Sequence, residues 1–171
     1  MHMCVPVAPV CLFLSANQLM GLAPGEVFEH RNIANCINHT DLNALSVLQY
    51  AVEYLKVQDI IVCGHYVCGG VRAALSTQEF GLIDNWLRVI KDTYVANQEQ
   101  IDKLPTEEER HDKMVELNVV RSVSRWTEVS AFLFLIASPF PGSERCQHCD
   151  RAICVEEGAK SCGSWPGLRR S

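Results

Sequence analysis

The chain has 171 residues, a net charge of −5 and 48% hydrophobic residues. This is about the length of one domain, with enough apolar residues for a core and too many for a disordered chain. The acidic balance argues against a nucleic-acid-binding protein and against attachment to an anionic membrane surface, because both need a basic face. We therefore expect no nucleic-acid partner and no membrane partner.

The nine cysteines form an odd number, so they cannot all pair within one monomer. Reduced thiols and a bound metal fit this pattern better than a disulfide framework. The first residues lack the Lys or Arg that normally opens a secretory signal. The apolar run 131–140 is shorter than the ~20 residues of a membrane helix. We expect a cytoplasmic protein, with a mitochondrion or another organelle as alternatives.

The chain divides into three pieces by its patterns. Residues 1–15 are apolar, broken by prolines and weakly periodic. Residues 16–125 alternate strand-like and helix-like patterns, which is typical of one folded domain. Residues 126–171 contain turn formers and four cysteines without a sustained period. We expect this tail to be poorly ordered, or ordered only by a metal or by partners.

The first half of the middle piece predicts a strand followed by a helix. A short strand is expected within 25–35, after a Pro-Gly turn. A helix is expected over 40–57, with Thr40 or Asp41 as its N-cap. The apolar residues of this helix recur at helical spacing: Leu45, Leu48, Val52 and Leu55.

The second half continues the alternation. Residues 59–65 read as a strand buried on both faces, as in a parallel sheet. A helix is expected from Gly69, another over 81–98, and a third over 106–125 with Thr106 as its N-cap and an acidic first turn. The helix over 81–98 has a predicted apolar face of Leu82, Trp86, Val89, Ile90 and Tyr94. This order predicts an α/β fold.

The segment "GHYVCGG", Gly64 to Gly70, carries the strongest chemical signal. His65 and Cys68 are three residues apart at the end of a predicted strand, and imidazole with thiolate is a zinc-type ligand set. Gly69 and Gly70 permit a close backbone approach, and amides at a helix start favour a small anion such as bicarbonate. A His-x-x-Cys pair is also compatible with a simple hydrogen-bonded turn, and catalytic zinc takes three protein ligands.

"GHYVCGG" resembles the Gly-His-x-x-Cys-Gly-Gly motif of the β-class carbonic anhydrases. "LMGLAPGEVFEHRNIAN" and "LNVVRSVSR" are similar to two further segments of that family. The resemblance spans about Ala16 to Arg125, and both ends depart from it. It implies a mostly parallel β-sheet with flanking helices, incomplete at both ends here, in a homodimer or higher oligomer.

The resemblance also implies an activity and a site. The family reaction is the reversible hydration of carbon dioxide to bicarbonate, with Zn²⁺ as cofactor. His65 and Cys68 would be two of the three zinc ligands, and Gly69 and Gly70 would bind the substrate.

The family's Cys-x-Asp-x-Arg motif, which holds the first zinc ligand, is absent here. Its cysteine would fall near Pro9. Cys11 is two positions later, and a shift of two residues along a strand keeps the face but moves the thiol by roughly 7 Å. No catalytic residue is therefore assigned. The alternative function is a catalytically impaired or inactive, truncated family member that acts, if at all, as a subunit or binding partner.

Other polar residues have simpler interpretations. Arg31 and Asn32 are expected in a hydrogen-bond network that fixes a turn, and Cys63 in the core. His30 and His39 are expected on the surface or in turns. The tail cysteines, which include a Cys-x-x-Cys pair, allow a third interpretation as a zinc knuckle or redox module. They are Cys146, Cys149, Cys154 and Cys162.

Overall fold

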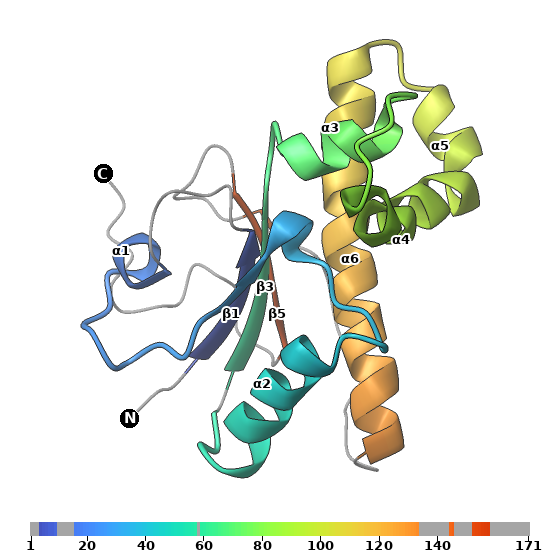
Figure 1. Ribbon diagram of the computed structural model, residues 1–171. Coiled ribbons are helices and arrows are strands. Elements are labelled where there is room, and N and C mark those ends of the chain that lie inside the picture. Colours follow the sequence, from blue (N-terminus) through green and yellow to red (C-terminus); the bar gives the residue numbers. More distant parts are fainter. Residues whose placement is uncertain (1–3, 10–15, 58, 134–143, 146–151, 158–171) are drawn as a thin grey trace.

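The computed structural model describes residues 4–9, 16–57, 59–133, 144–145 and 152–157, which form a sheet flanked by helices (Figure 1). The strands are β1 (Cys4–Pro9), β2 (His30–Asn32), β3 (Asp59–His65), β4 (Glu144–Arg145) and β5 (Ala152–Glu157). The helices are α1 (Ala16–Met20), α2 (Leu42–Glu53), α3 (Gly69–Leu75), α4 (Ile83–Ala96), α5 (Gln98–Asp102) and α6 (Glu107–Leu133).

The sheet has the strand order β2-β1-β3-β5-β4. The pairs β1–β2 and β1–β3 are parallel, whereas β3–β5 and β5–β4 are antiparallel. The α/β fold is thus confirmed, with the parallel pairing in the half that contains β1. In the register of β3 with β5, Cys63 lies opposite Cys154. Helix α6 continues past Arg125, the boundary expected from the sequence, to Leu133.

Strand β3 is the buried centre of the sheet. Its residues Ile60 to Cys63 are all buried, which confirms a strand covered on both faces and places the Cys63 thiol in the core. Helix α6 runs beside the sheet along most of the height of the molecule, with α3, α4 and α5 at one end (Figure 1). Gly64 lies where α6 packs closely against β3, because a Cβ there would meet Val119 Cγ2 at 2.5 Å.

Two predicted helix caps are present. Asp41 Oδ1 accepts hydrogen bonds from the amides of Asn43 at 3.1 Å and Ala44 at 3.2 Å at the start of α2. Thr106 Oγ1 accepts one from the amide of Glu109 at 3.1 Å before α6. Each satisfies an amide that the first helical turn leaves without a partner.

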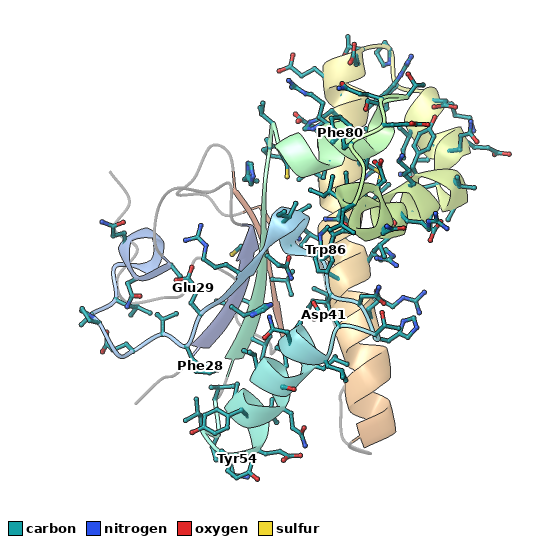
Figure 2. The ribbon with its side chains drawn as sticks, in the orientation of Figure 1. Phe28, Glu29, Asp41, Tyr54, Phe80 and Trp86 are labelled. Atoms are coloured by element: carbon teal, nitrogen blue, oxygen red, sulfur yellow. The ribbon has the colours of Figure 1, made fainter. Side chains whose placement is uncertain are left out.

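The predicted apolar face of α4 is only partly right. Ile90 is buried as expected, and Leu87 and Thr93 are the other buried residues of the helix. Leu82 is 88% exposed, because α4 begins one residue after it and the chain there still belongs to the preceding turn. Trp86 lies at the border of the core, where α4 approaches the turn after β2 (Figure 2).

Candidate functional site

Strand β3 ends in His65, and a short turn leads from it to Cys68 at the N-cap of α3. Cys68 is 1% exposed and His65 is half-buried. Val67 lies between them with a φ of +58°, in the left-handed region that a β-branched residue rarely adopts. This sharp turn brings the two side chains together, as the sequence predicted.

The His65 ring is oriented by the backbone carbonyl of the next residue, Tyr66. His65 Nδ1 lies 2.8 Å from the carbonyl oxygen of Tyr66. A carbonyl oxygen only accepts, so Nδ1 carries the proton, and Nε2 is the ring nitrogen that could bind a metal through its lone pair in the neutral ring. This is the arrangement usual for metal-binding histidines, in which one nitrogen donates to a carbonyl and the other faces the ion.

His65 and Cys68 favour each other's charged forms. Hydrogen bonding to Cys68 is the main reason why the pKa of His65 is raised, and it outweighs burial, which lowers it. Burial alone would raise the pKa of Cys68, but the hydrogen bond from His65 and the amides of Val71 and Gly70 lower it overall. A thiol of lowered pKa beside an imidazole is a donor set that suits zinc.

The two glycines after Cys68 differ in their surroundings. A Cβ on Gly70 would lie 3.0 Å from Ala34 Cβ and 3.3 Å from Ile33 Cγ2, so the absence of a side chain allows α3 to pack on the turn after β2. Gly69 is exposed, and a Cβ there would meet nothing within 4 Å.

The turn after β2, residues Ile33–Asn35, is a 3-10 helix against which the start of α3 packs. Ala34 and Asn35 both have positive φ, at 59° and 43°. Asn32 closes the turn as predicted: its Nδ2 donates to the carbonyl oxygen of Cys36 at 2.7 Å, and its Oδ1 accepts from the Cys36 amide at 2.9 Å. Arg31 pairs with Glu29 at 3.3 Å.

His30 is a correction to the sequence analysis. The side chain of His30 is buried, with 8% exposure. His30 begins β2, which pairs with the inner strand β1. Burial lowers its pKa, partly offset by Asp41. His39 is exposed, as predicted.

Helix α6 contributes buried residues that pack against and hydrogen-bond to the turns around the site, and the sequence analysis did not identify them. They recur on one face of the helix: His111, Val115, Asn118, Val119 and Ser122. Asn118 Nδ2 donates to the Ala34 carbonyl oxygen at 2.7 Å, and Ser122 Oγ donates to that of Asn35 at 2.9 Å. The signal available in the sequence was a polar residue at every turn or two of an otherwise apolar stripe.

Within the described residues, no group of three or more His, Cys, Asp or Glu side chains is placed to hold a metal ion. In the parallel register of β1 with β3, Val7 lies opposite Val62, so Pro9 lies about level with Gly64. Pro9 therefore lies next to the end of β3 that carries His65. Cys11, Cys146, Cys149 and Cys162 lie outside the described residues. In the described part of the chain, no helix is long and apolar enough to cross a membrane.

Comparisons with known proteins identify the family. The family described as carbonic anhydrase matches residues 14–133. Over 107 residues the chain is 50% identical to a carbonic anhydrase of Emericella nidulans, covering 63% of this chain and 47% of that protein. Over 112 residues it is 39% identical to a carbonic anhydrase of Candida albicans, covering 64% and 40%.

A solved structure extends the match to the fold. A tetrameric β-carbonic anhydrase of Sordaria macrospora superposes with a TM-score of 0.70 at 34% identity, covering 77% of this chain and 70% of that one. The chain spans about half the length, or less, of the two curated relatives. The chain belongs to the carbonic anhydrase family, in its β class.

Proposed function

We propose that this chain is a zinc-dependent carbonic anhydrase that hydrates carbon dioxide reversibly to bicarbonate. The observation that carries the proposal is the pair of His65 and Cys68 after β3, with the imidazole oriented by the Tyr66 carbonyl and a thiol of lowered pKa beside it. His65 and Cys68 would hold the metal. A bound zinc ion supplies a Lewis acid that makes a hydroxide nucleophile available near neutral pH.

The residues of this chain would position the reactants. The Tyr66 carbonyl keeps the His65 ring in one orientation, and hydrogen bonds from His65 and from the amides of Val71 and Gly70 lower the pKa of Cys68. Gly69 and Gly70 are proposed to lie along the substrate. Open space in front of Gly69 supports this, whereas Gly70 is packed against Ala34.

A second candidate is a catalytically impaired subunit that pairs with an intact family member. One observation favours it: the described residues offer two ligands rather than three. The Sordaria macrospora relatives are tetrameric, which supports a homodimer or higher oligomer as the working assembly here. We propose a cytoplasmic location on the basis of the cysteine pattern, although a relative in Arabidopsis thaliana is mitochondrial.

The test is zinc content by mass spectrometry together with stopped-flow carbon dioxide hydration on the purified chain. We expect about one zinc per chain, lost in Cys68→Ser and retained in Cys63→Ser. Cys63 is the matched control, because it is a buried thiol on β3, the strand that ends in His65. Zinc without hydration activity would favour the impaired subunit. Equal zinc in the Cys68 and Cys63 variants would overturn the assignment of the metal site.

A further inference from the structure

His111, on the second turn of α6, is buried at 6% exposure and reaches the strand-turn-helix segment that carries Cys68. Its Nε2 lies 3.1 Å from the carbonyl oxygen of Cys68, forty-three residues away in sequence. A carbonyl oxygen only accepts, so Nε2 carries the proton and donates. We propose that His111 is a positioning residue that holds the Cys68 peptide, and with it the thiol; this inference rests on the proposed zinc site.

The carbonyl oxygen of Cys68 accepts two hydrogen bonds. It accepts the first helical hydrogen bond of α3, from the Arg72 amide at 3.0 Å. The bond from His111 uses its second lone pair. Cys68 itself is extended, with φ −67° and ψ 119°, directly before the helical residues begin. The two bonds together define the plane of the peptide from which α3 starts.

This peptide needs a support because the residue before it is strained. Val67 has a φ of +58°, a backbone conformation that is unfavourable for a β-branched side chain. Val67 is itself 52% exposed, so its own packing does little to hold that conformation. Such a conformation persists only when its neighbours fix it from both sides.

Helix α6 provides both fixed points. On one side of Val67, the hydroxyl of Tyr66 donates to Glu116 Oε1 at 3.1 Å. On the other side, His111 donates to the Cys68 carbonyl. Lys113 keeps Glu116 in place with a contact of 3.2 Å to its other oxygen. The strained residue is thus clamped between two hydrogen bonds from one rigid helix.

These two hydrogen bonds matter for metal binding, because the distances from a metal ion to its ligand atoms must be correct within about 0.2 Å. If the Cys68 peptide rotates, its thiol moves away from His65. Partners of ligands that lie outside the coordination shell typically contribute 10- to 100-fold to metal affinity. His111 acts through the backbone, so we expect a value near the lower end of that range.

Two variants separate hydrogen bonding from simple packing. His111→Leu keeps an apolar volume in the core but has no donor. His111→Gln places an amide N–H about where Nε2 lies in histidine. Zinc affinity, measured by competition with a chelator, is expected to fall about 10-fold in His111→Leu and to stay within about 3-fold of the parent in His111→Gln. Cys68→Ser defines the affinity of a chain without the site.

Hydrogen exchange of the zinc-free chain provides a readout that does not need the metal. The amides at the start of α3 should exchange faster in His111→Leu and at the parent rate in His111→Gln, with urea unfolding showing that global opening is not the cause. Unchanged exchange in His111→Leu, or equal loss in both variants, would overturn the positioning role. If the parent binds zinc no better than Cys68→Ser, the proposed function fails, and the exchange result still decides the role of His111.

Discussion

The side-chain amide of Asn118 donates a hydrogen bond of 2.7 Å to the carbonyl oxygen of Ala34, although the two residues are eighty-four positions apart. Ala34 is fully buried and has a left-handed φ of 59°. This one bond therefore ties the long helix α6 to the strained turn on which Gly70 and α3 rest. Removing this bond should therefore destabilise the turn at Ala34.

Asn118→Ala should lower the free energy of unfolding by about 1–3 kcal/mol, because it leaves the buried Ala34 carbonyl with only the weak thiol donor of Cys36 at 3.5 Å. Urea unfolding followed by circular dichroism measures the change. Ser46→Ala is the control, since Ser46 makes an exposed hydrogen bond within α2 and its loss should change stability by less than about 0.5 kcal/mol. Equal effects of the two variants would contradict a special role for the bond.

Gly64→Ala should destabilise the chain by about 1–3 kcal/mol, because the new Cβ would meet Val119 Cγ2, and a valine on a helix has little freedom to move away. The double variant with Val119→Ala should recover part of the loss. Gly69→Ala is the matched control: its Cβ meets nothing within 4 Å, so it should be neutral or stabilising by up to about 1 kcal/mol. Thermal unfolding of the four proteins would show whether the close approach of β3 and α6 is the cause.

Lys56→Gly should stabilise the chain by up to about 1 kcal/mol. Lys56 follows α2 with a φ of +54°, a conformation that glycine adopts without steric cost. Lys56→Ala removes the same exposed side chain but keeps a Cβ, and it should leave the urea midpoint nearly unchanged. A stabilisation of equal size in both variants would point to the charge rather than to the backbone.

The contribution of His30 to stability should fall as the pH drops below about 6.5, the ordinary pKa of histidine, whereas the raised pKa of His65 contributes with the opposite sign. Burial lowers the pKa of His30 in the folded chain, so the unfolded chain binds a proton there first. Its contribution is therefore fully present above the unfolded pKa and is lost as the pH falls through the folded value.

His30→Gln should flatten this part of the pH dependence, measured as urea midpoints from about pH 7.5 to about pH 5. His39→Gln removes an exposed histidine and serves as the control. A slope that responds to His39 but not to His30 would show that burial of His30 is not the cause.

Much of the fold could be predicted because its signals are local. Asp41 and Thr106 are recognisable as N-caps, since a capping side chain bonds to amides two or three residues away. The burial of β3 follows from a continuous run of apolar residues. By contrast, Leu82 was assigned to a buried face by its periodicity alone, and the start of α4 one residue later leaves it in solvent.

The sequence by itself determined the family, the α/β alternation and the pair of His65 and Cys68, because each depends on residues that are close together in the chain. Only the tertiary structure decided what surrounds that pair. His111, Glu116 and Asn118 look like ordinary polar residues of a helix until α6 is packed against β3 and the turn after β2. Their partners lie from forty-three to eighty-four residues away. Contacts at such separations are formed by packing, which no local pattern specifies.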